Sequence, residues 1–182
     1  RLDKGEFIVT SELTPPKGTS LEALFAKAEM LAKGVDAFNL TDCHGANMAM
    51  SPMAVAHLLI DRGIEPIMQM TSRDRNRIAQ QSDLLGAHAL GVRNVVFMGG
   101  DPPTNGDHPE AKGVFDLGSV ELLAAARGLN GGTDLAGKSL KGQTELLIGA
   151  VANPGADDVE AELARLGQKL ESGAKFFQTQ AV

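Results

Sequence analysis

The sequence predicts an α/β fold of parallel strands alternating with helices, either an open doubly wound sheet or a (β/α)8 barrel. Six short apolar, β-favouring runs recur along 182 residues, mostly at intervals of about 30 residues, with helical patterns between them. The runs are continuous rather than alternating, which is typical of strands buried on both faces. This order requires parallel strands joined by crossover helices. No Gly-x-Gly-x-x-Gly motif follows a run, which disfavours a dinucleotide-binding Rossmann fold.

Each element follows from its own residues. The expected strands cover residues 7–10, 37–40, 66–68, 94–98, 146–151 and 175–177. The expected helices cover about 21–31, 51–63, 74–90, a segment around 120–124, and 157–171. Ser20 is a candidate N-cap of the first helix, and the Ser51-Pro52 pair is a favourable start for the second. Stretches rich in Gly, Asn and Thr around 102–113 and 128–144 predict a long loop insertion between the fourth and fifth strands.

Composition narrows the class of protein. With 17 Lys and Arg against 23 Asp and Glu, the net charge is −6, which disfavours a broad nucleic-acid interface. No run reaches the roughly 18 apolar residues of a membrane span, and the first residues lack the apolar core of a secretion signal. Cys43, the single cysteine, allows no intramolecular disulfide and no cysteine-based metal cluster. We therefore expect a cytoplasmic protein that binds no nucleic acid, membrane or metal, its four histidines being scattered.

Polar side chains follow every predicted strand at its carboxyl end. They are Glu12, Thr41, Asp42, Gln69, Thr71, Asp101, Asn153, Thr179 and Gln180. In a βα barrel these ends converge on the face that carries catalysis. Taken singly, each has a plainer explanation as the first residue of a loop or a helix cap. Together they predict a polar site at one mouth of the fold.

Two of these positions suit specific chemistry. Glu12, followed by Leu13 and the rigid Pro15-Pro16 pair, is expected to be partly desolvated, which would raise its pKa and suit a general acid. A solvated or helix-capping glutamate is the alternative. Asp101 follows two glycines that would let a flat ligand approach the backbone, although an ordinary turn explains the same residues.

Three motifs, in order along the chain, resemble those of a known family. They are Glu12-Leu13-Thr14-Pro15-Pro16, Gly100-Asp101-Pro102-Pro103, and the segment from Ser172-Gly173-Ala174 to Thr179-Gln180. On these the chain resembles the methylenetetrahydrofolate reductases, flavin-dependent βα-barrel enzymes of one-carbon metabolism. Further segments resemble one branch, which includes the reductase half of bifunctional homocysteine methyltransferase/methylenetetrahydrofolate reductases and the acetogen-type reductases. Those segments are Arg73-Asp74-Arg75-Asn76, residues 84–91, residues 113–116 and Ala152-Asn153-Pro154.

The resemblance implies a (β/α)8 TIM barrel, of which residues 1–182 would supply about six βα units and lack strands seven and eight. It implies FAD as cofactor and reduction of 5,10-methylenetetrahydrofolate to 5-methyltetrahydrofolate, a step that serves methionine biosynthesis. NADH or NADPH would be the electron donor. The protein would be a homo-oligomer or part of a redox complex.

The resemblance also assigns roles to residues of this chain. Glu12 corresponds to the general acid, Asp101 to an aspartate beside flavin and folate, and Gln180 to a glutamine that contacts folate or nicotinamide. The implied cofactor-binding set is Thr41, Gln69, Thr71, Gly100, Asp101, Asn153, Glu162, Arg165 and Lys169. For Glu162, Arg165 and Lys169, a solvated helix face is the alternative. Better-known bacterial members carry histidine at Gln69 and arginine at Gly99, so the flavin contacts on that side are expected to differ.

Two other functions remain open from the sequence. An incomplete barrel could be a non-catalytic folate-binding, flavin-binding or interaction subunit completed by a partner. A βα barrel that binds a pterin or a phosphate without flavin is the third possibility.

Overall fold

Six parallel strands form one sheet in the order β1-β2-β3-β4-β5-β6, so every strand pairs with its neighbour along the chain. The strands are β1 (Thr10–Leu13), β2 (Ala37–Leu40), β3 (Pro66–Thr71), β4 (Asn94–Met98), β5 (Leu147–Ala152) and β6 (Phe176–Thr179). The structure is a computed structural model that describes residues 2–179, with Asp3 by its backbone alone. The strictly sequential order excludes a doubly wound sheet, in which the order reverses at a switch point.

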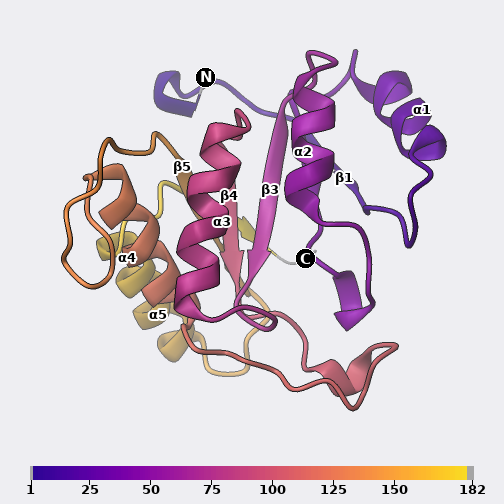
Figure 1. Cartoon of the computed structure of the whole chain (residues 1–182). Helices are drawn as coiled ribbons and strands as arrows, with labels where there is room; N and C mark the ends of the chain where they lie inside the picture. Colours follow the sequence, from indigo (N-terminus) through magenta and orange to yellow (C-terminus); the bar gives the residue numbers. More distant parts are fainter. Residues whose placement is uncertain (1, 180–182) are drawn as a thin grey trace.

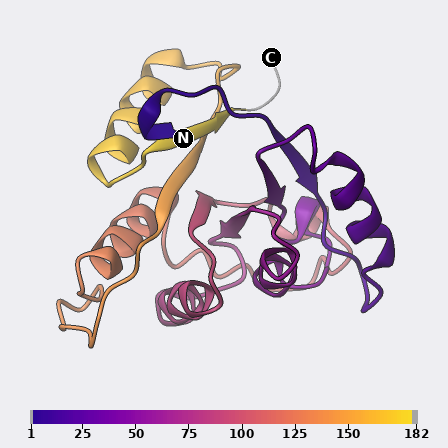
Figure 2. The same ribbon diagram turned by 90° about the horizontal axis from the view of Figure 1, so that it is seen from above.

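Helices cover the outer face of the sheet, and the sheet curls into a half-barrel (Figure 1, Figure 2). The α-helices are α1 (Glu22–Leu31), α2 (Pro52–Ile60), α3 (Arg77–Ala89), α4 (Ser119–Asn130) and α5 (Val159–Glu171). Three short 3-10 turns are η1 (Leu2–Lys4), η2 (His44–Ala46) and η3 (Pro103–Asn105). The predicted partial barrel is therefore confirmed, with six parallel strands and five α-helices alternating in the described part of the chain. Among the described residues, no helix combines the length and the apolar character that a membrane crossing requires.

Two apolar layers hold the strands. Alternate strand residues such as Leu13, Phe38 and Phe97 are fully buried against the helices. The residues between them face the interior of the half-barrel, where Val96 belongs to an apolar cluster with Ala37, Ile67 and the ring of Phe176. A Cβ on Gly149 would come within 2.6 Å of that ring, so glycine at this position lets the Phe176 ring lie directly against β5. This alternation decides which polar residues can reach the interior.

The prediction for the first strand is wrong by three residues. The strand runs from Thr10 to Leu13, whereas Phe7 is 87% exposed and Val9 contacts Asp36 through its backbone N–H and carbonyl. The apolar run at 7–9 has no helix to cover it, while Leu13 packs against the helix layer. Glu12 therefore lies inside β1 rather than after it.

The other elements follow the sequence more closely. Strands β2 and β4 have the predicted bounds, and α5 begins two residues later than expected. The N-cap prediction for Ser20 is wrong, because Leu21 holds that position and the Ser20 hydroxyl donates instead to the Glu22 carboxylate. The predicted loop insertion occurs on both sides of α4, as segments 99–118 and 131–146.

Candidate active site

The carboxyl ends of β2, β3 and β4 are joined by a network of hydrogen bonds and ion pairs around the buried Asp42. Its carboxylate accepts hydrogen bonds from the Thr71 backbone N–H at 2.9 Å and the Thr71 hydroxyl at 3.0 Å. Arg75 pairs with the same carboxylate at 2.8 Å and with Asp83 at 2.9 Å. Asp42 thus connects the end of β2 to the end of β3. The neighbouring Thr41 is also buried, and its Oγ1 has no hydrogen-bond partner among the described residues.

Arg73 attaches the end of β4 to this network. Its guanidinium pairs with Asp74 and donates to the backbone carbonyls of Asp101 and Cys43, each at 3.4 Å. The hydrogen bond with Asp74 raises the pKa of the buried Arg73 side chain, which therefore stays charged. Arg73 fixes the backbone at Asp101, whose side chain is exposed.

Gly100, which follows β4, lies directly against Thr71 at the end of β3. It has φ +87, and a Cβ there would approach the Cβ of Thr71 to 3.0 Å. A left-handed conformation and this close approach both favour glycine. The structure therefore groups four predicted site residues, Thr41, Thr71, Gly100 and Asp101, around the ends of three adjacent strands.

Glu12 occupies the inner face of the neighbouring strand. It pairs in register with Asn39, and by alternation with the buried Leu13 its side chain faces the half-barrel interior. The Thr41 backbone N–H donates to the Leu13 carbonyl at 3.3 Å, so Glu12 and Thr41 lie at the same edge of the sheet. The expected desolvation of Glu12 is wrong. The residue is exposed, because it projects into the open interior and not into the helix layer.

A polar chain that the sequence analysis missed crosses the interior beside Glu12. The Asn39 side-chain amide donates to the Thr10 hydroxyl at 3.2 Å, and the Gln178 amide donates to the Asn39 carbonyl oxygen. These groups connect β6 to β2 and β1 across the curl of the sheet. The available signal was a polar residue in the middle of an otherwise apolar run, which is unusual for a strand buried on both faces.

The remaining predicted cofactor contacts are more scattered. Gln69 is half-buried inside β3, paired in register with Val96. Asn153 follows β5, where its side-chain oxygen accepts from Gly155 N–H and its own backbone N–H donates to Glu162 at 3.0 Å. Asn153 and Glu162 line a largely apolar cavity of about 290 Å³ between β5, β6 and α5. These residues form a group of their own, with no contact to the Asp42 network in the structure as described.

The charged residues of α5 split between buried and exposed positions. Glu162 and Lys169 are buried, which rejects a fully solvated helix face. The hydrogen bond from Asn153 N–H lowers the pKa of Glu162, whereas burial lowers the pKa of Lys169. Lys169 Nζ donates to the Val151 carbonyl at 2.6 Å, and Arg165, 58% exposed, pairs with Glu162 at 3.0 Å. Arg165 is therefore the cation of this group with access to solvent.

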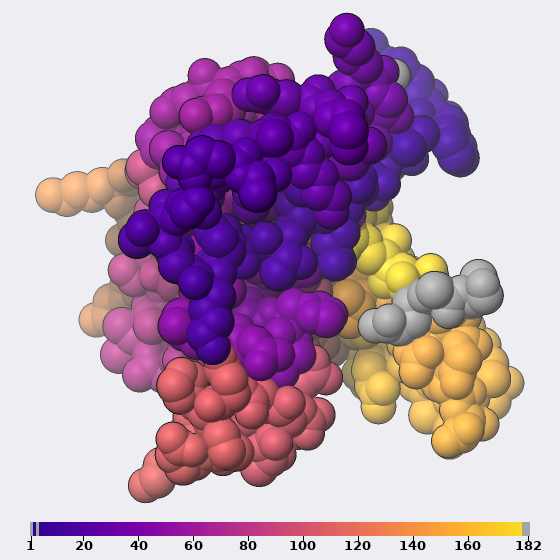
Figure 3. All heavy atoms as spheres, turned by 90° about the vertical axis from the view of Figure 1, so that its right-hand side faces the viewer, coloured from indigo at the N-terminus to yellow at the C-terminus, as the bar shows by residue number. Residues whose placement is uncertain are grey.

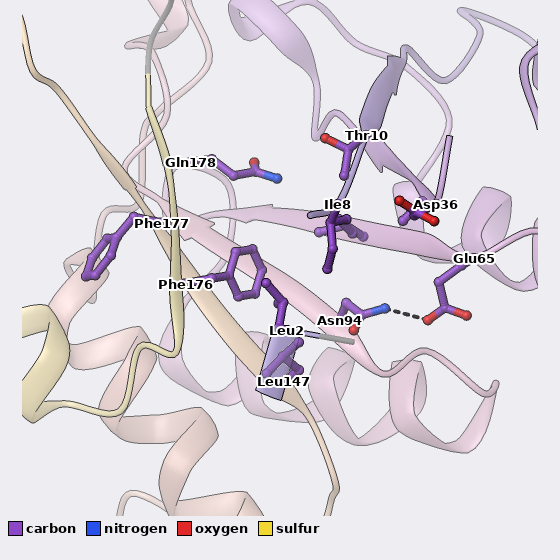
Figure 4. Close-up of a pocket in the computed structure, with 12 residues that line it drawn as sticks. Leu2, Ile8, Thr10, Asp36, Glu65, Asn94, Leu147, Phe176, Phe177 and Gln178 are labelled. Carbon is purple, nitrogen blue, oxygen red and sulfur yellow. Dashed lines mark hydrogen bonds between the residues drawn. The ribbon is translucent and has the colours of Figure 1, made fainter. Parts of the chain in front are cut away.

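A cavity of about 580 Å³ lies at the opposite, amino-terminal end of the strands (Figure 4). Phe176 and Gln178 extend into it from β6 toward Thr10 and Ile8, and the Asn94 amide donates to Glu65 at its rim. It opens where β6 and β1 face each other without pairing (Figure 2). None of Glu12, Thr41 and Asp101 lines it, so it is separate from the mouth that carries the predicted catalytic residues.

Two predictions concern features outside these groups. Gln180 lies outside the described residues. Within residues 2–179, no three His, Cys, Asp or Glu side chains are placed to hold a metal ion. The roles of the individual site residues remain predictions.

Comparison with known proteins identifies the family to which this chain belongs. A solved structure of an uncharacterized protein from Clostridium thermocellum, described as binding two copies of 5-methyl-5,6,7,8-tetrahydrofolic acid, has the same fold, with a TM-score of 0.66 and 18% identity. The match covers 100% of this chain and 57% of that one, so this chain spans little more than half of its length. Comparison with curated protein sequences found no match. The family model described as methylenetetrahydrofolate reductase matches residues 1–182, and the chain therefore belongs to the methylenetetrahydrofolate reductase family.

Proposed function

We propose that this protein reduces 5,10-methylenetetrahydrofolate to 5-methyltetrahydrofolate with FAD as cofactor and NADH or NADPH as electron donor. The family match over the whole chain carries the proposal. The structural neighbour's 5-methyltetrahydrofolate supports a reduced folate as the ligand. The mouth formed by the ends of β1 to β4 is the proposed site.

The residues at this mouth fit a flavin. Thr41 offers a buried hydroxyl without a partner among the described residues, and Gly100 is exposed and carries no side chain, so a flat ligand can approach its backbone closely. Thr41, Gln69, Thr71 and Gly100 would hold the ring system, and the exposed Arg165 is the candidate for the phosphates. Bound there, the reduced flavin supplies a hydride.

Glu12 is the proposed general acid. The substrate carbon is held between two nitrogens of a five-membered ring, and the ring opens when one nitrogen is protonated. The carboxyl of Glu12 projects from β1 toward the interior with access to an entering ligand. In the proposed step it donates its proton to that nitrogen, which leaves an electrophilic iminium carbon.

Asp101 is the proposed electrostatic partner of that cation. Its exposed carboxylate follows β4, and Arg73 holds its backbone in place. A fixed negative charge stabilises the positive charge that develops on the folate during ring opening. Asp101 would also disfavour an anionic reduced flavin.

An absorbance spectrum of the purified protein tests the proposal. The chain contains no Trp and no Tyr, so its own ultraviolet absorbance is very weak and a bound flavin would dominate. We expect visible flavin bands that are bleached by NADH or NADPH and restored by methylenetetrahydrofolate. A colourless protein that cannot be loaded with FAD would contradict the proposal.

The open edges of β1 and β6 support a second candidate function. Each of these strands pairs on one side only within the described sheet, and the 580 Å³ cavity lies between them. A non-catalytic folate-binding, flavin-binding or interaction subunit completed by a partner would have such edges. A stable complex or oligomer that binds ligand without flavin turnover would favour this candidate.

A further inference from the structure

Three loops that follow different strands meet at one carboxylate, that of Asp107. Lys17 of the β1–α1 loop donates its ammonium to Asp107 Oδ2, and Met48 N–H of the β2–α2 loop donates to Asp107 Oδ1 at 3.0 Å. Asp107 itself belongs to the β4–α4 loop. His108 Nε2 lies 3.9 Å from Oδ1 and adds a second, weaker positive neighbour when protonated.

The backbone around this carboxylate is packed closely. Met50 N–H donates to the Pro16 carbonyl at 2.9 Å, which ties the first two loops together a second time. A Cβ on Gly106 would lie 1.9 Å from the carbonyl oxygen of Ala46, so the third loop approaches the second as closely as glycine permits. In the space-filling view, the segment around residues 100–115 packs against the N-terminal segments (Figure 3).

These loops lead directly to the proposed catalytic and binding residues. Glu12 is near the end of β1, Thr41 follows β2, and Asp101 follows β4. Because each loop is anchored at its strand, a contact that fixes the three loops together also fixes the relative positions of those side chains. A misplacement of about 1 Å at a reacting group can reduce a rate by about 100-fold.

We propose that Asp107 is a positioning residue that clasps the β1–α1, β2–α2 and β4–α4 loops and so sets the spacing of Glu12, Thr41 and Asp101 around the ligand. The hydrogen bonds from Lys17 and then Met48 lower the pKa of Asp107, which keeps the clasp charged at neutral pH. Asp107 has no contact with reacting atoms in this proposal. The loop clasp consists of the contacts that Asp107 makes with Lys17 and Met48. Its effect on ligand binding rests on the proposed function.

A graded set of variants separates the two contacts of the carboxylate. Asp107→Asn keeps an oxygen that can accept from Met48 N–H but loses the charge that pairs with Lys17. Asp107→Ala loses both, and Lys17→Met loses only the ion pair. Glu110→Gln, which changes an exposed carboxylate on the same loop, is the matched control.

Hydrogen exchange of the ligand-free protein measures the clasp directly. We expect the Met48 amide to exchange about tenfold faster or more in Asp107→Ala, because a hydrogen bond to a charged acceptor is lost. Exchange in Asp107→Asn should be much closer to wild type, and exchange in Glu110→Gln should equal wild type. Global unfolding should change little across the set, because the pair lies at the surface, with Lys17 59% exposed. Equal Met48 exchange in Asp107→Ala and wild type would overturn the clasp.

Binding of FAD and of 5-methyltetrahydrofolate then measures its consequence. We expect the dissociation constant for 5-methyltetrahydrofolate to rise about tenfold in Asp107→Ala and to be partly rescued in Asp107→Asn. Affinity in Asp107→Ala equal to that in Glu110→Gln would overturn the positioning role. If the wild-type protein binds neither ligand, the proposed function fails, and Met48 exchange alone decides the clasp.

Discussion

The β1–β4 sector (residues 10–118) and the β5–β6 sector (residues 147–179) belong to one sheet but differ in the polar contacts that stabilise them. In the first, polar groups connect different βα units, as Asp42 does with Arg75 and Asp107 with Lys17. In the second, Glu162 and Lys169 bond within their own βα unit, Glu162 to the Asn153 N–H and the Arg165 side chain, and Lys169 to the Val151 carbonyl.

Loop length explains the contact made by Asp107. The 99–118 loop is long enough to reach back over two neighbouring loops, whereas β5 and α5 are joined by the short segment 153–158. The second sector also leaves apolar side chains of α5 exposed, among them Val159, Leu163 and Leu170. The β1–β4 sector therefore has a mouth defined by contacts between its loops, whereas the polar contacts of Glu162 and Lys169 in the β5–β6 sector stay within one βα unit.

The largest expected effect tests whether the chemistry belongs to the β1–β4 sector. We expect Glu12→Gln to keep FAD and its reduction by NADH or NADPH but to slow folate reduction about 10²–10⁴-fold, the usual contribution of a general acid. Asn153→Ala, in the other sector, should lower activity far less. Glu29→Gln, a carboxylate on the outer helix α1, is the control for charge. Unchanged folate turnover in Glu12→Gln would remove Glu12 from the acid role.

The second test breaks the buried link within the first sector. Arg75→Met leaves the Asp42 carboxylate, 1% exposed, without its charge partner, so we expect a loss of unfolding free energy of about 3–5 kcal/mol. Denaturant unfolding measures it, and Asp42→Asn combined with Arg75→Met should recover part of the loss. Arg77→Met is the control, since Arg77 pairs with Asp116 at the surface. A loss no larger than that of the control would show that the network does not stabilise this sector.

The third test concerns a buried side-chain amide without hydrogen-bond partners in the β1–β4 sector. Gln80 on α3 is fully buried, and neither atom of its amide has a partner among the described residues. Gln80→Met keeps the side-chain volume and removes the unpaired groups, so we expect a gain of about 1–2 kcal/mol. The neighbouring Gln81 donates to the Arg77 carbonyl and accepts from Leu135 N–H, so Gln81→Met should bring no such gain. A loss of stability in Gln80→Met would mean that the amide is paired in solution.

The smallest expected effect concerns the β5–β6 sector and depends on pH. Burial lowers the pKa of Lys169 in the folded state below its ordinary value of 10.5. Between these two values the unfolded chain holds a proton that the folded protein lacks, so stability should rise with pH across that window. Lys169→Met should remove this rise, and Lys175→Met, at an exposed position, should keep it. Thermal unfolding at a series of alkaline pH values measures the difference, and parallel profiles for wild type and Lys169→Met would contradict the shift.

Much of the fold could be predicted because parallel strands buried on both faces leave a strong local signal. The apolar runs at 37–40 and 94–98 gave exact strand bounds, and the alternation with helices gave the parallel sheet. The prediction of the first strand was wrong because Phe7, Ile8 and Val9 have the composition of a strand. Which residues actually pair in the sheet depends on which of them can pack against a helix. The burial of Lys169 was not evident either, because its acceptor is a backbone carbonyl 18 residues away.

The order of secondary structure and the polar residues at the strand ends were determined by the sequence alone, because hydrophobic periodicity and turn residues act over short stretches of chain. Which of those polar residues share a site was decided only by the tertiary structure. Asp42 pairs with Arg75, 33 residues away, and Asp107 pairs with Lys17, 90 residues away, and no local pattern specifies such contacts. The curl of the sheet brings them together, since it is the packing of the helix layer on the strands that fixes which loops meet.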